Sequence, residues 1–175
     1  MGATGGNGLD KKKRALLRGL SRRPGVSEEN LRQAQEELHL ALPPAYQEFL
    51  LWTDGAAGAI GALTLRLWPV GEIAGYNARF GVARHAPLLV LFGTLNERTG
   101  LAFDRGSAAG AIMAVPLAAL SCNAAQLVAM DFWTLLWRLH RFPTARVSAL
   151  WAYLYLQPTA GMPLPISLEV RRSRR

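Results

Sequence analysis

The chain has 175 residues, of which 50% are hydrophobic and 18% charged, so it is long enough to bury the core of one compact domain without disulfides or metals. Cys122 is the single cysteine, which excludes an intramolecular disulfide and favours a reducing, cytoplasmic setting. Residues 106–130 and 147–168 are uncharged and longer than the roughly 20 residues of a membrane span. Prolines and polar side chains interrupt both stretches, and we predict no membrane-spanning segment.

The formal net charge of +8 is concentrated at the two ends of the chain. Residues 1–24 hold seven basic side chains against one acid, and residues 171–175 hold four arginines, whereas residues 25–170 carry a net charge of −2. We therefore divide the chain into a partly flexible basic leader (1–24), a domain (25–157) and a C-terminal extension with a basic tail (158–175). The ends predict a weak contact with polyanions. Leu16, Leu17 and Leu20 are expected to dock the leader on the body, and the domain is expected to fold without either end.

Residues 27–58 contain the most complete local signals, which predict two helices joined by a corner. Ser27 is a good N-cap, and Glu28 and Glu29 complement the positive end of the helix dipole. Pro43 stops this helix, and proline suits the first turn of the next one. The apolar stripe of the first helix is Leu31, Ala34, Leu38 and Ala41, that of the second is Tyr46, Phe49 and Leu50, and Gly55 and Gly58 are expected to end the second helix.

The residue pattern then changes to that of strands. Leucines at positions 63, 65 and 67 alternate with polar residues, residues 87–93 and 100–104 read as a hairpin, and residues 110–115 as a further strand. Asn123 with Gln126 predicts the start of a helix with a stripe from Val128 to Leu139, and residues 147–154 form another stripe. We predict an α+β fold with an N-terminal helix pair, a small, largely antiparallel central sheet and C-terminal helices packed on one face.

Four short motifs in this order resemble the SUKH superfamily, which includes fungal cell-wall assembly regulators and many bacterial immunity proteins. The resemblance covers about residues 25 to 140. The motifs are the acidic helix 28–38 followed by Leu42-Pro43, Tyr46, Phe49-Leu50 and Asp54-Gly55; Leu67-Trp68-Pro69 with Glu72-Ile73 and Asn77; Leu91-Phe92-Gly93 with residues 100–104; and Asp131-Phe132 with Leu135-Leu136. Residues 94–99 depart from the glycine- and acid-rich turn that the family has in the hairpin.

The sequence contains candidates for catalysis but no established constellation. Four carboxylates fall near loops or strand ends, where they either converge as a general acid and base or cap helices and turns: Asp54, Glu72, Glu97 and Asp104. The three histidines lack the spacing of a metal site, and the glycine-rich residues 2–8 lack the strand and the lysine of a phosphate cradle. We therefore predict no metal, no cofactor and no enzymatic activity.

Aromatic residues at the helix-to-strand junction and in the glycine-bearing loop predicted after residues 63–67 indicate a recognition surface, because aromatic anchors dominate protein interfaces. The predicted site combines them with neighbouring polar residues: Trp52, Asp54, Trp68, Glu72, Tyr76, Asn77 and Asp104. With the resemblance, this surface implies a cytoplasmic immunity protein that binds a bacterial toxin domain and neutralises it by occlusion. Two alternatives stay open: a small-molecule enzyme that uses the loop carboxylates, and a nucleic-acid or envelope-associated regulator that acts through the basic ends.

Overall fold

The computed structural model describes residues 9–107 and 110–141. The elements of the first half are α1 (Lys11–Leu16), β1 (Leu20–Arg22), α2 (Glu28–Leu38), α3 (Pro44–Trp52), β2 (Ala56–Ile60), β3 (Leu63–Leu67), α4 (Val70–Arg79) and α5 (Val82–His85). Those of the second half are β4 (Leu89–Leu95), β5 (Thr99–Asp104), β6 (Ile112–Pro116), the 3₁₀ turns η1 (Leu117–Ala119) and η2 (Cys122–Ala124), β7 (Gln126–Ala129) and α6 (Phe132–His140).

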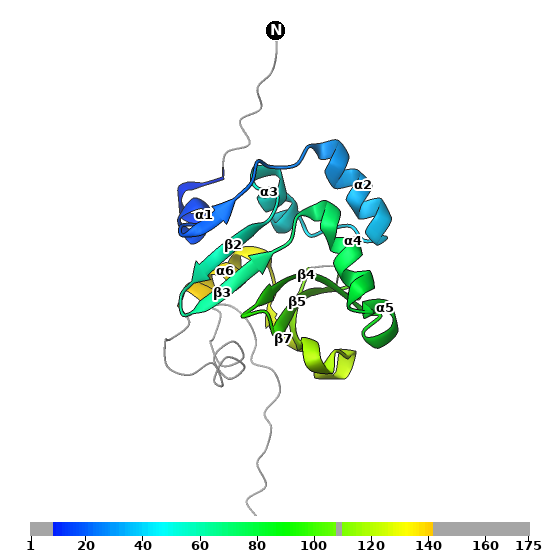
Figure 1. Ribbon diagram of the computed structural model, residues 1–175. Helices are drawn as coiled ribbons and strands as arrows, with labels where there is room; N and C mark the ends of the chain where they lie inside the picture. Colours follow the sequence, from blue (N-terminus) through cyan, green and yellow to red (C-terminus); the bar gives the residue numbers. More distant parts are fainter. Residues whose placement is uncertain (1–8, 108–109, 142–175) are drawn as a thin grey trace, which may run out of the picture.

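The strands described form one seven-stranded antiparallel sheet in the sequential order β1-β2-β3-β4-β5-β6-β7. Helix α6 lies behind β2 and β3, while α2 and α4 lie side by side near the other end of these strands (Figure 1). The predicted α+β class is confirmed. The second predicted C-terminal helix, at residues 147–154, lies outside the described residues.

Five fully buried aromatic rings join the sheet to the helices α3 and α6. Tyr46 and Phe49 come from α3, Phe92 and Phe103 from β4 and β5, and Phe132 from the first turn of α6. The centroids of the Phe92 and Phe103 rings are 4.2 Å apart, and the Tyr46 ring lies 5.1 Å from three of the other four. Helix α3, which begins at the corner after α2, therefore supplies two of the rings at the centre of the core.

Several sequence predictions about local structure are confirmed, with changes at the helix ends. The Ser27 side chain accepts a hydrogen bond from the backbone N–H of Asn30, as an N-cap does. Helix α2 ends at Leu38, since His39 takes the left-handed conformation, and Ala41 lies beyond it and is exposed. Helix α3 ends at Trp52, before either predicted glycine, and Gly58 lies inside β2. The alternation of Leu63, Leu65 and Leu67 is confirmed in β3.

Two segments adopt a different structure from the predicted one. Residues 126–129 form the edge strand β7 where the sequence predicts the start of a helix, and α6 begins only after Asp131, whose carboxylate accepts the N–H groups of Trp133 and Thr134. A side chain that caps two free N–H groups outweighs the weaker Asn123 signal. Residues 70–79, expected to be a loop, form α4. Two glycines, Gly71 and Gly75, lower the helix propensity of this segment, so the sequence pattern does not predict the helix.

Residues 9–23 pack against the body, as the leucine docking prediction requires, although the predicted boundary after residue 24 stays a prediction. Leu9, Leu17 and Leu20 are buried in the common core, and β1 pairs with β2. Lys13 forms an ion pair with Glu48 at 2.5 Å. Further along, a ring nitrogen of His140 lies 2.6 Å from the carbonyl oxygen of Leu16. These contacts argue against the expectation that the domain folds without this segment.

Removing residues 1–23 should therefore lower the free energy of unfolding by more than about 4 kcal/mol, because each buried leucine that is lost costs about 2–5 kcal/mol. Urea unfolding followed by circular dichroism measures the change. The double substitution Lys11→Gln and Lys12→Gln, at exposed positions of α1, is the control and should leave the midpoint unchanged. A truncated chain that unfolds at the wild-type midpoint would contradict this role of the segment.

Tyr46→Phe should leave the free energy of unfolding at pH 7 unchanged or raise it by about 1 kcal/mol, because the buried Tyr46 hydroxyl has no hydrogen-bond partner among the described residues. Burial, and secondarily the charge of Asp54, raise the pKa of Tyr46 above its usual 10.0. The unfolded chain therefore loses this proton first, and the wild-type protein should lose stability above pH 10, by up to about 1.4 kcal/mol per pH unit. The variant should lose less, as measured by urea unfolding between pH 8 and 11.5.

Phe49→Ala is the matched control for Tyr46→Phe, because it removes a ring of the same cluster and leaves a cavity. It should cost about 3–5 kcal/mol at every pH. A Tyr46→Phe variant that is less stable than the wild type by more than 1 kcal/mol would mean that the hydroxyl has a partner.

Candidate functional site

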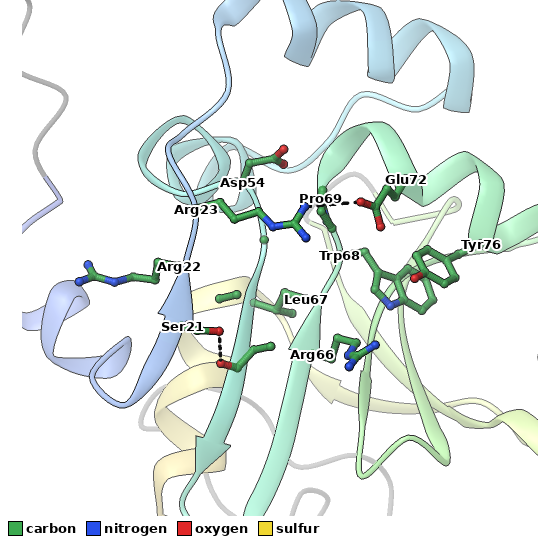
Figure 2. A pocket seen from close by; sticks show the side chains of 13 residues that line it. Ser21, Arg22, Arg23, Asp54, Arg66, Leu67, Trp68, Pro69, Glu72 and Tyr76 are labelled. Atoms are coloured by element: carbon green, nitrogen blue, oxygen red, sulfur yellow. Dashed lines mark hydrogen bonds and ion pairs between the residues drawn. The ribbon is translucent and has the colours of Figure 1, made fainter.

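A half-open cleft of about 260 Å³ lies where α4 leaves the end of β3. Figure 2 shows β1 and the segment after it on one side of the cleft, α4 on the other, and the strands β2 and β3 beneath. Its lining residues are Ser21, Arg22, Arg23, Asp54, Gly55, Ala56, Ala57, Arg66, Leu67, Trp68, Pro69, Glu72 and Tyr76.

The wall on the α4 side is fixed by a side chain from another part of the chain. Pro69 is the N-cap of α4 and has no side chain that can cap a helix, so the carboxylate of Asp54 accepts the backbone N–H of Val70 at 2.7 Å. The Tyr76 ring stacks on Trp68 with a centroid distance of 4.3 Å. Trp68 is only 3% exposed, so Tyr76 covers it and presents the partly exposed surface of this pair.

The floor of the cleft is the outer face of β1, β2 and β3, where small side chains leave the backbone uncovered. Ser21 pairs with Ala57 and Ala57 pairs with Arg66, so these three side chains share one face. The Ser21 hydroxyl donates to the carbonyl oxygen of Ala57 at 2.9 Å and stays close to the sheet. Because two of the three side chains are this short, the sheet is hollow here and the exposed Arg66 stands at the edge of the hollow.

The β1 side of the cleft is held by the buried Thr53. Its hydroxyl accepts the backbone N–H of Arg23 and lies 2.9 Å from the carbonyl oxygens of Arg23 and Gly55. Gly55 has φ +81°, and a Cβ atom there would lie 2.8 Å from the carbonyl oxygen of Leu67, so only glycine fits this close approach. The Arg23 guanidinium reaches across to Glu72 at 3.5 Å, where both side chains are largely exposed.

The structure brings four of the seven predicted site residues together in the cleft: Asp54, Trp68, Glu72 and Tyr76. Trp52, at the end of α3, is not a lining residue, and its ring lies 4.5 Å beneath the guanidinium carbon of Arg22. Asp104 ends β5 and accepts the N–H of Gly106, as expected of a carboxylate that caps a turn. Glu97 lies in the turn between β4 and β5, so these two acids do not line the cleft with Asp54 and Glu72.

Asn77, the remaining predicted residue, replaces a missing strand partner. Strand β3 leaves the sheet after Leu67 while β4 continues, which frees the backbone groups of Leu91. The Asn77 amide donates to the carbonyl oxygen of Leu91 at 2.7 Å and accepts its N–H at 2.9 Å. It also donates to the carbonyl oxygen of Ile73 at 2.8 Å. Asn77 therefore positions α4 on the sheet and does not line the cleft.

Sequence reasoning missed the arginines of the cleft and its small floor residues. Ser21, Arg22 and Arg23 belong to or follow a three-residue strand that is too short to leave a period-2 signal. Arg66 was detectable, since it is an outward position in the clear alternation of β3. Ala57 carries no signal of its own, because alanine at a strand position is uninformative until the neighbouring strands are known.

Two further observations concern the described part of the chain. Among residues 9–107 and 110–141, no group of three or more His, Cys, Asp and Glu side chains is placed to hold a metal ion. In the same residues, no helix has both the length and the apolar composition needed to cross a bilayer.

Asn77→Ala should lower the free energy of unfolding by about 2–4 kcal/mol. The substitution leaves the buried N–H and C=O groups of Leu91 without a hydrogen-bond partner, and each unpaired group lowers stability by about 1–3 kcal/mol. Chemical denaturation measures the loss, and Glu72→Gln, a change in the same helix at an exposed position, should leave the stability within about 0.5 kcal/mol of the wild type. An Asn77→Ala protein as stable as the wild type would show that water satisfies Leu91.

Comparison with known proteins identifies the family of this fold. A search of curated proteins found no match. The model of the SMI1 / KNR4 family (SUKH-1) matches residues 25–124, which is more than half of the chain. The matched range contains α4 and the strands β2 to β6, and every lining residue of the cleft except Ser21, Arg22 and Arg23. Three of the four sequence motifs lie within the matched residues, and the chain thus belongs to the SMI1 / KNR4 family (SUKH-1).

Proposed function

We propose that this protein is a non-enzymatic, cytoplasmic immunity protein, which binds a bacterial toxin domain through the cleft beside α4 and neutralises it by occlusion. Membership in the SUKH-1 family agrees with such a role. Asp54, Trp68, Glu72 and Tyr76 form the proposed binding site together with the cleft residues from β1 and β3, while Trp52, Asn77 and Asp104 act as structural residues around it. Residues 25–157 are the proposed family domain, with residues 1–24 and 158–175 as additions to it.

The observation that carries this proposal is the construction of the cleft from a rigid frame. The end of β3, the start of α4 and the segment after β1 are held by Asp54, Asn77 and Thr53 through hydrogen bonds to backbone groups. A partner that docks here meets a surface that is already ordered, so binding costs little conformational entropy. Stoichiometric inhibition requires an ordered surface that fits the toxin and no catalytic residues.

The positions of the carboxylates favour binding over the alternative of a small-molecule enzyme. Asp54 uses an oxygen to hold the N–H of Val70, and Glu72 is exposed and faces Arg23. Asp104 belongs to a turn after β5. A general acid and base need two carboxyl groups directed at one substrate, and these three have separate partners.

The test fills the cleft without removing a packed side chain. Ala57→Tyr adds a large side chain to the floor, and tyrosine suits a strand. Ala59→Tyr is the matched control, because Ala59 is exposed on the same face of β2, two residues further along, and does not line the cleft. Tagged wild-type and variant proteins are used to capture partners from the source cells, followed by mass spectrometry and by expression of each captured protein in a susceptible host.

The expected result is one protein that the wild type and Ala59→Tyr capture and that Ala57→Tyr captures at least tenfold less. That protein should stop growth of the host, and co-expression of the wild type should restore growth. Equal capture by both variants would remove the cleft as the interface. A captured protein that does not affect growth would overturn the immunity role.

A further inference from the structure

Charged side chains of both signs line the cleft. Arg22, Arg23 and Arg66 line it against Asp54 and Glu72. Arg22 lies over the Trp52 ring and points away from the cleft toward α1 (Figure 2). Asp54 is turned to the start of α4. The groups that remain toward the open side are Arg66, Arg23 and Glu72.

Arg66 is the strongest feature among these three. It is exposed on the outer face of β3, and among the described residues its guanidinium forms no ion pair. A guanidinium offers a planar set of N–H donors that matches a carboxylate with two parallel hydrogen bonds. Arg66 rises from an ordered strand between Leu65 and Leu67, which are buried, so its backbone position is fixed.

Arg23 provides a second guanidinium, and its ion pair with Glu72 can break at a small cost in free energy. Its contact with Glu72 is 3.5 Å long, and the two side chains are 64% and 48% exposed. Ion pairs in this exposed setting contribute little to stability, since water and salt screen them. An incoming carboxylate can therefore replace Glu72 as the partner of Arg23, while Glu72 turns to a donor such as a peptide N–H.

The size and the walls of the cleft select a protein side chain over other anions. Its 260 Å³ is below the roughly 300–1,000 Å³ of pockets that enclose a drug-sized ligand, so one or two side chains fill it. Single-stranded nucleic acid stacks successive bases on several free aromatic faces. Of the two aromatic lining residues, Trp68 is covered by Tyr76, which leaves a single partly exposed ring.

We propose that the cleft binds one or two acidic side chains of a protein partner, with the guanidinium groups of Arg66 and Arg23 as the carboxylate receptors. This inference rests on the proposed function, because it states which surface of the bound protein meets the cleft: an acidic one. Arg23 and the β1 residues of the cleft lie outside the residues that match the family model.

The test uses the full-length protein and three probes of known composition. Two are the peptides acetyl-Gly-Glu-Glu-Gly-amide and acetyl-Gly-Gln-Gln-Gly-amide, and the third is a single-stranded oligothymidylate. Each is titrated into isotope-labelled protein, and nuclear magnetic resonance follows the Nε–Hε groups of arginines and the backbone amide of Ala57. The variants are Arg66→Gln and Arg66→Lys, and the matched control is Arg98→Gln, at an exposed arginine in the turn between β4 and β5.

The glutamate peptide should shift the signals of Arg66, Arg23 and Ala57, and the glutamine peptide should not. Arg66→Gln should weaken the binding about tenfold, Arg66→Lys should weaken it less because the charge remains, and Arg98→Gln should leave it unchanged. Equal effects of the two peptides, or no binding of the glutamate peptide, would overturn the inference. Oligothymidylate that shifts the same signals with the same dependence on Arg66 would assign the surface to nucleic acid and overturn it as well.

The two proposals fail in different ways. A captured partner that Ala57→Tyr loses and Arg66→Gln keeps would leave the cleft as the interface and reject the acidic chemistry. Specific binding of the glutamate peptide, together with a captured protein that has no toxicity, would keep the acidic chemistry and reject the immunity role.

Discussion

The geometry of the candidate site depends on the backbone groups of Leu91. Strand β3 leaves the sheet after Leu67 while β4 continues, so the N–H and C=O groups of Leu91 in the buried strand β4 have no partner on a neighbouring strand. Such groups are costly when unpaired. The Asn77 amide supplies both missing hydrogen bonds, and this fixes α4 at the edge of β3. The cleft is the space between this helix and the strands that α4 does not cover, so the residue that shapes the site lies outside it.

Side chains that bond backbone groups of another segment also hold the rest of the frame. Asp54 and Thr53 follow α3 directly, and each serves backbone groups from another segment, the start of α4 and the residues after β1. Polar side chains that satisfy backbone donors and acceptors are ordered by several hydrogen bonds and have little freedom left. Glu72, Arg23, Arg66 and Tyr76 sit on this frame with exposed or partly exposed side chains. The protein thus separates the residues that build the surface from those that are free to make new contacts.

The sequence predicts those parts of the fold whose signals are local. The Ser27 cap, the corner at Pro43 and the alternation in β3 involve neighbours within a few residues, and the structure has each of them. The predictions fail where the structure of a segment depends on residues that are far away in the sequence. Residues 70–79 are helical because Asp54 caps them and Asn77 docks them on β4, and β1 is a strand because β2 provides its ladder. Four of the seven predicted site residues line the cleft, since aromatic and acidic residues near strand ends are a fair guide. The floor exists only through the register of three strands, which the sequence does not reveal.

The contact between the first and last described helices has a consequence for synthesis of the chain. The carbonyl oxygen of Leu16 meets the His140 ring, and Glu48, the ion-pair partner of Lys13, accepts the indole N–H of Trp133. Ribosomes add about 5–20 residues per second, so the 124 positions that separate Leu16 from His140 take roughly 6 to 25 s to translate. During that interval α1 lacks its contacts with α6. Helix α1 therefore completes its native contacts only after α6 has been made.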